Sequence, residues 1–337
     1  MPCAYVETAG SRIRLESERL IVTAPRDRES TTPPEETNVP LFNLDRVLLG
    51  EQVQITTQAV CALLRRGIPL GYLGWSGDFL GETEPPASRH SGLRLRQYDR
   101  TRDAAFCLEI SRRLIAAKIA NQRRLLQRLN SSRERLTTGE IAAVSQQEQH
   151  ASTAFALGEL RGAEGVAAAR FFALWARFLP DEFPFERRSA HPPLNAVNAC
   201  LGYLSAIVHA ELVSAIHQQG LEPGLGCLHV TSDYRCSLAL DLMEPFRPTV
   251  IEALTVRLFT LGILGTGDFE PREGGAVYLT TAGKRKLLAQ YESRVQREFF
   301  AECLGHRTTV RRQYAAAAAG FATALEAPEN LHPFRLN

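Results

Sequence analysis

The segment AFCLEISRRLIAAKIANQRRLLQRL, residues 105–129, decides the fold of this chain. Its apolar residues recur at three- and four-residue spacing, which is the period of one face of an α-helix. Upstream of it, short β-prone runs such as RIRLE and RLIVTA alternate with small or charged residues. This change of period near residue 100 predicts an α+β fold with two domains. We expect a β-rich N-terminal domain at residues 1–100 and a larger, all-α C-terminal domain at residues 101–330.

The N-terminal domain is predicted to consist mainly of hairpins. The runs CAYVE, RIRLE and RLIVTA are punctuated by turn residues, and RVLLGEQVQIT has Gly50-Glu51 between two β-prone runs. Residues 29–38 belong to a polar stretch with adjacent prolines, so we predict a loop there. A short helix ending at Gly67 and the buried strand IPLGYLGW complete this domain.

Helical patterns continue through the rest of the chain. TTGEIAAVSQQEQHASTAFALGEL is predicted to be one helix capped by Thr137 or Thr138, and GAEGVAAARFFALWARFL is predicted to be the next. The run from the second proline of a Pro-Pro pair to Gly220 follows the usual preference for Pro at the start and Gly at the end of a helix. Ser237 is predicted to cap a later helix that Pro245 must kink or end. TTAGKRKLLAQYESRVQREFF and VRRQYAAAAAGFATALEA complete the array.

Composition narrows the class of protein only slightly. With 337 residues, 45% hydrophobic and 23% charged, the chain has the composition of a globular protein and enough length for two cores. Only three of its 39 basic residues are lysines. The guanidinium of Arg matches the geometry of phosphate, but an arginine bias also arises from genome composition. The formal net charge of +2 therefore does not identify a partner.

The seven cysteines and the apolar runs indicate the compartment. The cysteines are odd in number and form no CxxC pair, which is typical of a reduced protein without a disulfide framework. The N-terminus has no apolar signal-peptide region, and we expect no apolar run long enough to span a membrane. These patterns predict a soluble, cytoplasmic protein with no membrane contact.

The chemistry is carried by LHVTSDYRCSLALDLMEPFRP, residues 228–248. His229 precedes a predicted helix on which Asp241 and Glu244 lie one turn apart on the same face. Upstream, Glu164 stands in RGAEGVAAARFFALW. Carboxylates combined with an imidazole suit Mg²⁺ or Mn²⁺ better than a thiolate zinc site does. The sequence therefore predicts phosphodiester chemistry on nucleic acid.

Each of these residues also has a plainer interpretation. Glu164 can be a surface glutamate near the start of a helix, and His229 can be a core histidine bonded to a backbone carbonyl. Asp241 and Glu244 can be exposed helix acids. Their apolar neighbours argue against this, because an unpaired acid is costly to bury and a bound cation removes that cost.

Taken in order along the chain, several segments resemble those of the CRISPR-associated integrases, the Cas-one family. They are QITTQAVCALLRRGIPLGYL, LRLRQY, AAKIANQRRLLQR, GAEGVAAARFFALW, FPFERRSAHPPLNAVNACLGYLSAIVHAEL, GLEPGLGCLHV and SLALDLMEPFRP. The resemblance covers nearly the whole chain. It implies a homodimer in which the N-terminal domain serves dimerisation and partner contacts and the helical domain is catalytic. The implied ligands of the divalent metal are Glu164, His229 and Glu244, with Asp241 as a second-shell or auxiliary carboxylate.

The resemblance also implies a reaction and partners. A prespacer DNA 3′-OH is joined to a CRISPR repeat by transesterification, with Mg²⁺ or Mn²⁺ as the Lewis acid. The implied partner is a small ferredoxin-like subunit of the Cas-two family, and the need for an accessory trimming nuclease is left open. The polar loop at 29–38 is longer than we expect for the family and could alter partner contacts. Two alternatives remain: a transposon-borne integrase of the same fold and a non-catalytic DNA-binding scaffold.

Several basic side chains flank the motifs and are candidates for contacts to DNA phosphates. They are Arg187, Arg188, Arg235, Arg247 and Lys118. Such contacts position DNA without reading its sequence, and runs of charge are often merely solvated faces. Tyr203 is a candidate for stacking on a base, although a tyrosine in an apolar helix is more often part of the core.

Overall fold

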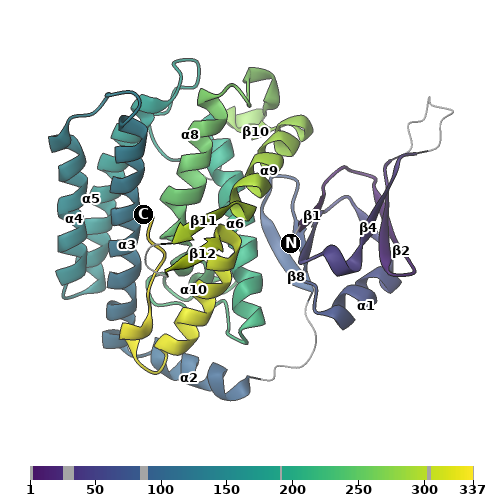
Figure 1. Cartoon of the computed structure of the whole chain (residues 1–337), viewed down its shortest axis with the longest axis horizontal. Helices are drawn as coiled ribbons and strands as arrows, with labels where there is room; N and C mark the ends of the chain where they lie inside the picture. The colour runs from purple at the N-terminus through teal and green to yellow at the C-terminus, as the bar shows by residue number, and fades with distance from the viewer. Residues whose placement is uncertain (1–2, 26–33, 84–89, 190–191, 302–304, 337) are drawn as a thin grey trace. The chain divides into compact units, whose positions relative to one another are not determined.

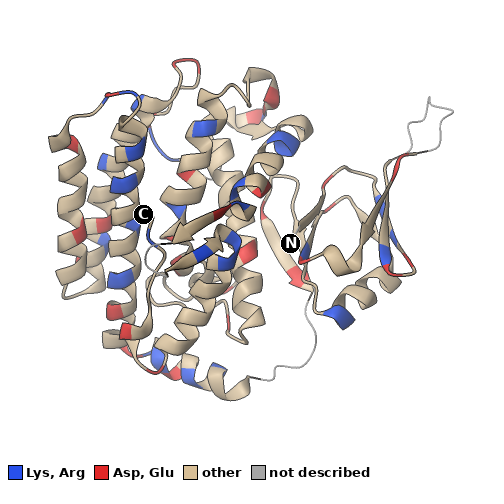
Figure 2. Ribbon diagram, in the orientation of Figure 1, with Lys and Arg blue, Asp and Glu red and all other residues tan. Residues whose placement is uncertain are grey.

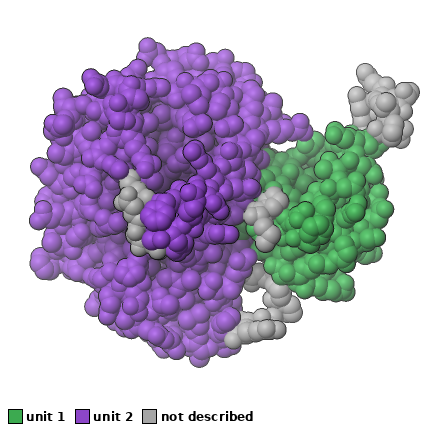
Figure 3. All heavy atoms as spheres, viewed as in Figure 1, with its two compact units in different colours: residues 1–88 green, residues 89–337 purple. Residues whose placement is uncertain are grey.

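The fold is taken from a computed structural model. It describes residues 3–25, 34–83, 90–189, 192–301 and 305–336. The chain forms two compact units, residues 1–88 and residues 89–337 (Figure 3). The division precedes the predicted junction near residue 100 because helix α2 (Ser91–Thr101) is bonded to the second unit. Gln97, which is fully buried on α2, donates to the carbonyls of Glu222 and Leu225 at 2.9 and 3.0 Å.

The first unit contains, among its described residues, two four-stranded sheets and one α-helix. One sheet has the order β1-β5-β7-β8 and the other the order β4-β3-β2-β6. The strands are β1 (Cys3–Val6), β2 (Arg12–Glu16), β3 (Arg19–Thr23), β4 (Glu36–Pro40), β5 (Arg46–Gly50), β6 (Gln54–Ile55), β7 (Leu70–Leu73) and β8 (Phe79–Thr83). Helix α1 (Thr57–Arg66) begins at the Thr56 cap and ends at Gly67, which has the left-handed φ of 65° that suits a glycine.

Two predictions for this unit need correction. The strands β2 and β3 form the expected hairpin, but β5, which ends at Gly50, and β6, which follows Glu51, enter different sheets. Each of them pairs with a parallel partner far along the chain, which local patterns do not reveal. The predicted loop at 29–38 lies partly outside the described residues, and its end, from Glu36, is part of β4.

The second unit is predominantly helical (Figure 1). Its helices after α2 are α3 (Ala104–Asn130), α4 (Thr138–Thr153), α5 (Leu157–Trp175), α6 (Ala196–Gln218), α7 (Ser237–Met243), α8 (Ala253–Thr260), α9 (Thr281–Gln296) and α10 (Val310–Ala324). A π-helical turn, Arg247–Glu252, joins α7 to α8. Helices α3, α4 and α5 pack side by side. The α+β architecture predicted from the change of period is confirmed.

The prediction of an all-α C-terminal domain is wrong in one respect, because the helical unit also contains strands. It carries two small antiparallel sheets, formed by β9 (Phe269–Pro271) with β10 (Val277–Leu279) and by β11 (Glu298–Ala301) with β12 (His306–Thr309). The first part of β11 is EFF, which we had assigned to the preceding helix.

Two helix ends also differ from the prediction. The helix expected over TTGEIAAVSQQEQHASTAFALGEL breaks after Thr153, although its Thr137 cap forms the full capping box. Ser237 does not cap α7. Its hydroxyl donates to the Val230 carbonyl at 3.0 Å.

Helix α6 is largely buried within the helical unit and packs on α7 and α10. By length and composition alone it could cross a membrane, which corrects our expectation that no run reaches that length. However, 78% of its most apolar window is buried inside the protein, so its hydrophobicity has a packing role. Among the described cysteines none forms a disulfide, and Cys303 lies outside the described residues.

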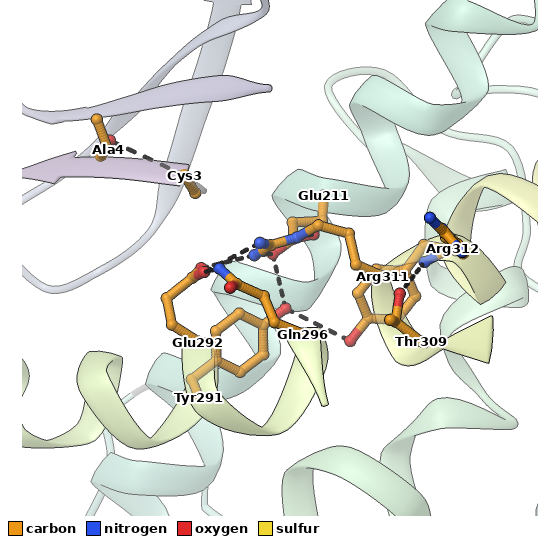
Figure 4. A network of polar contacts seen from close by, with 10 residues as sticks. Cys3, Ala4, Glu211, Tyr291, Glu292, Gln296, Thr309, Arg311 and Arg312 are labelled. Atoms are coloured by element: carbon orange, nitrogen blue, oxygen red, sulfur yellow. Dashed lines mark hydrogen bonds and ion pairs between the residues drawn. The ribbon is translucent and has the colours of Figure 1, made fainter. Parts of the chain in front are cut away.

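A buried ionic network fixes α6 to α9 and α10 (Figure 4). Arg311 of α10 donates two hydrogen bonds to the carboxylate of Glu211 on α6, at 2.7 and 2.9 Å, and also pairs with Glu292 of α9 at 2.6 Å. The hydroxyl of Tyr291 adds a hydrogen bond of 2.9 Å to Glu211. Because every charge has a partner of opposite sign, the network tolerates its burial.

Candidate functional site

A pocket of about 370 Å³ in the helical unit brings together the three predicted ligands. Glu164 lies on α5, His229 lies in the segment before α7, and Glu244 is the C-cap residue directly after α7. The remaining lining residues are Ile115, Arg161, Leu228, Val230 and Arg235. Three side chains that are far apart in sequence therefore face one cavity.

Lys118 lies between the two glutamates. Its Nζ is 2.5 Å from Oε1 of Glu164 and 2.6 Å from Oε2 of Glu244. The side chains of Lys118 and Glu244 are only 10% and 6% exposed, whereas that of Glu164 is 29% exposed. Burial lowers the pKa of Lys118, but the two carboxylates outweigh it, and the net effect is a raised pKa. The lysine therefore remains charged.

Glu244 is held in its ionised form by two cations. Besides Lys118, the guanidinium of Arg247 contacts it, with Nε 3.0 Å from Oε1. Burial would raise the pKa of Glu244, but Lys118 and Arg247 together lower it to about 2. Oε2 of Glu244 is buried and has no well-directed hydrogen bond, although the ammonium of Lys118 lies close to it.

Asp241 orients His229 and the loop that carries it. Its side chain is fully buried, and its Oδ2 accepts hydrogen bonds from the backbone N–H groups of Cys227 and Leu228 at 2.6 and 2.9 Å. Its Oδ1 accepts from the backbone N–H of His229 at 3.0 Å and from Nδ1 at 2.6 Å. Because a carboxylate only accepts hydrogen bonds, Nδ1 carries a proton, which places the lone pair of the neutral imidazole on Nε2.

The residues present fit a divalent cation. Two carboxylates and an imidazole with a free nitrogen supply hard oxygen ligands and one nitrogen ligand, the set that Mn²⁺ and Mg²⁺ accept. As the side chains stand, no group of three or more His, Cys, Asp or Glu residues in the described part of the chain is close enough to hold a metal. Lys118, not a third ligand, is the group that now lies between the glutamates.

The other predicted contacts lie in different surroundings. Arg235 is exposed and lines the pocket, and Arg187 is exposed but does not line it. Arg188 donates to the Asn198 side chain at 3.0 Å, and burial lowers its pKa to about 10. Tyr203 is buried, as in the plainer interpretation, and the ammonium of Lys284 lies 5.4 Å from its ring centroid.

Two of the predicted DNA contacts are instead engaged inside the protein. Lys118 and Arg247 turn toward Glu244 because a buried carboxylate needs nearby positive charge. Figure 2 shows basic and acidic residues interspersed over both units.

Arg161 is a pocket residue that the sequence analysis missed. It precedes Glu164 by one helical turn on α5, and its guanidinium donates to the Leu228 carbonyl at 2.5 Å. The i, i+3 spacing from a predicted ligand was the signal that would have identified it.

The fold and the pocket define a class of proteins with a β-rich unit and a helical unit that holds a carboxylate–imidazole pocket. Solved structures share this fold. A casposase bound to its integration product has a TM-score of 0.86 at 22% identity and covers 97% of this chain and 91% of its own. A CAS1 protein from Thermotoga maritima has a TM-score of 0.81 at 20% identity and covers 97% of both chains.

Sequence relatives identify the family within this class. The family described as CRISPR associated protein Cas1 matches residues 4–293, and the chain belongs to this family. It is 33% identical to a Cas4 exonuclease/Cas1 endonuclease fusion of Geobacter sulfurreducens, over 88% of this chain but 52% of the fusion. It is 29% identical to the CRISPR-associated endonuclease Cas1 of Mycobacterium tuberculosis strain H37Rv, over 87% of this chain and 84% of the relative. The chain thus spans about half the length of the fusion proteins it matches.

Proposed function

We propose that this protein is a divalent-metal-dependent DNA integrase and endonuclease of CRISPR adaptation, which joins the 3′-OH ends of prespacer DNA to a CRISPR repeat. The observation that carries the proposal is the convergence of Glu164, His229 and Glu244 on one pocket in a member of the Cas1 family. These three residues would hold Mg²⁺ or Mn²⁺. When bound, the metal would act as a Lewis acid on the phosphodiester.

The residues of the chain itself have distinct parts in this proposal. Asp241 holds the imidazole of His229 through Nδ1, so that the neutral ring has its lone pair on Nε2 for a metal in the pocket. Arg235 and Arg161, both exposed at the pocket, are placed to contact a DNA phosphate. Arg247 neutralises one oxygen of Glu244 and so keeps that carboxylate ionised.

The proposed partners follow from the relatives. Two solved structures of the same fold are a Cas6-RT-Cas1–Cas2 complex and a partial form of that complex. We therefore propose a homodimer that works with a small subunit of the Cas-two family on prespacer and repeat DNA. In two relatives an exonuclease of the Cas4 type is fused to the Cas1 part, which supports a trimming nuclease as a further partner.

The test is a strand-transfer assay with the purified protein, its small subunit, a 3′-OH duplex and a repeat-bearing plasmid. We expect joined product with Mn²⁺ or Mg²⁺ and none with a chelator. Glu164→Ala and His229→Ala should abolish the product without unfolding the protein. Glu159→Ala, which changes another glutamate of α5 outside the pocket, serves as the matched control and should retain activity. Full activity in both pocket variants would refute the site, and DNA binding without joining in the wild type would favour a non-catalytic scaffold.

A transposon-borne integrase is the second candidate, because the casposase shares this fold with a TM-score of 0.86. The fold alone does not separate the two functions. The same assay separates them when the donor is varied. Preference for short duplexes of arbitrary sequence joined at a repeat supports CRISPR adaptation, whereas a requirement for specific element ends supports transposition.

A further inference from the structure

Lys118 contacts both pocket glutamates, and no other ion pair between described residues links the two. Arg247 reaches only Oε1 of Glu244, so the other oxygen of Glu244 and the carboxylate of Glu164 face the ammonium of Lys118. The two acids come from different elements, α5 and the end of α7, and Lys118 belongs to a third, α3. A single positive charge therefore links three separate elements at the pocket.

The helix that carries Lys118 is fixed by its packing, whereas the charge of Lys118 stands at the end of a long side chain that borders the pocket residues Glu164 and Glu244. One turn further along α3, the buried amide of Asn121 donates to the carbonyls of Pro245 and Phe334 at 2.8 and 2.9 Å. Ala117 and Ile119 on either side of the lysine are fully buried. The flexible four-carbon stem of lysine can nevertheless move its compact charge without moving the helix.

Electrostatics explains why a cation is needed at this point. Two carboxylates that approach each other in a mostly buried site repel, and each would be costly to leave unpaired. The ammonium removes both costs. The Lys118 ammonium also lies between the two carboxylates, where a divalent cation bound by both of them would have to lie.

We propose that Lys118 is an internal counter-ion, which keeps Glu164 and Glu244 together before a divalent cation binds and is displaced from them when it does. This inference rests on the proposed metal-dependent function. Lys118 thereby stabilises the metal-free protein and weakens the affinity of the pocket for the cation. Lysine suits this role better than arginine, because it gives up a point-charge contact and no two-pronged hydrogen bond.

The test compares the wild-type protein with Lys118→Met, which keeps an unbranched side chain only one atom shorter and removes its charge. The free Mn²⁺ signal in electron paramagnetic resonance reports binding, and thermal denaturation in chelator and in saturating Mn²⁺ reports stability. We expect Lys118→Met to unfold at a lower temperature than the wild type in chelator and to gain more from Mn²⁺. Its Mn²⁺ affinity should rise at least about tenfold, which corresponds to about 1.4 kcal/mol.

Lys286→Met is the matched control. Lys286 pairs with Asp268 at 2.8 Å outside the pocket, so this variant removes a lysine ion pair of the same unit without touching the glutamates. Its Mn²⁺ affinity should equal that of the wild type. An equal or weaker affinity in Lys118→Met than in the wild type would overturn the counter-ion proposal.

Two further variants keep the proposal separable from the function it rests on. In chelator, Glu164→Gln added to Lys118→Met should restore part of the lost stability, because it removes one of the two repelling charges. A double variant less stable than Lys118→Met would contradict the counter-ion role without any metal. If the wild type binds no Mn²⁺ at this pocket and Glu244→Gln changes nothing, it is the proposed metal-dependent function that fails.

Discussion

Asp241→Asn is the substitution with the sharpest expected effect on the pocket. Four hydrogen bonds converge on this carboxylate, three from backbone N–H groups and one from the imidazole of His229. An asparagine has only one oxygen, so it can keep only part of this set. Its amide NH₂ is expected to face His229, because an imidazole can change tautomer and accept a hydrogen bond, whereas a backbone N–H cannot.

The magnitude follows from this arrangement. The backbone N–H of His229 loses its acceptor, which costs about 1–3 kcal/mol, and the two bonds that remain lose charge assistance of about 1 kcal/mol each. The free energy of unfolding should therefore fall by about 3–5 kcal/mol. Acceptance at Nδ1 also moves the proton of His229 to Nε2, which removes the lone pair that a metal would use. We expect Mn²⁺ affinity to fall by about 10–100-fold.

Urea denaturation and Mn²⁺ titration measure the two effects separately. Glu211→Gln is the matched control, because it weakens a buried carboxylate network of the same unit that does not line the pocket (Figure 4). Breaking that ion pair should cost about 3–5 kcal/mol as well. Its Mn²⁺ affinity should be unchanged. Equal losses of affinity in both variants, or no loss in Asp241→Asn, would refute the reasoning about the tautomer.

The remaining predictions concern acid stability, packing and backbone conformation. The pKa of Glu244 is lowered from 4.5 to about 2, so its stabilising contribution is present above pH 4.5 and disappears as the pH falls toward 2. The difference in unfolding free energy between the wild type and Glu244→Gln, measured by urea denaturation in chelator, should therefore shrink over that window. A constant difference would contradict the assignment. Gly226→Ala should disturb the loop before His229, because its Cβ would lie 2.7 Å from Oδ2 of Asp241 and 2.8 Å from the backbone carbonyl carbon of Ser237. The amount of joined product in the strand-transfer assay should decrease strongly. Gly224→Ala, whose Cβ would have no neighbour closer than 3.6 Å, should reduce that amount only slightly. Tyr234 is fully exposed and has a left-handed φ of 61°. Thermal denaturation should therefore show Tyr234→Gly to be more stable than Tyr234→Ala by about 1 kcal/mol. The opposite order would show that the left-handed conformation is not strained.

Local periodicity predicted the helices well and the strand partners poorly. Helix α3 was recognised because its apolar residues repeat at the helical period, and its observed bounds differ from the predicted segment by one residue at each end. The partners of β5 and β6 could not be predicted in this way, because parallel pairing joins strands that are distant in sequence.

For the pocket, too, the local sequence predicted positions along a helix but not the contacts made across the fold. The spacing of Asp241 and Glu244 placed both acids on one helical turn. It did not show that the Asp241 carboxylate accepts hydrogen bonds from backbone N–H groups, whereas Glu244 lines the cavity. The inward turn of Lys118 was equally hidden. Its position on α3 is fixed by the helix period, whereas its partners come from two other elements that only the tertiary fold brings near.

Diffraction from crystals soaked in Mn²⁺, recorded near the manganese absorption edge, tests the central claim most directly. The account predicts one anomalous peak in the pocket within ligand distance of Glu164, His229 Nε2 and Glu244, with the ammonium of Lys118 moved away from at least one carboxylate. No peak at saturating Mn²⁺, or a peak elsewhere while Lys118 still bridges the two glutamates, would contradict it.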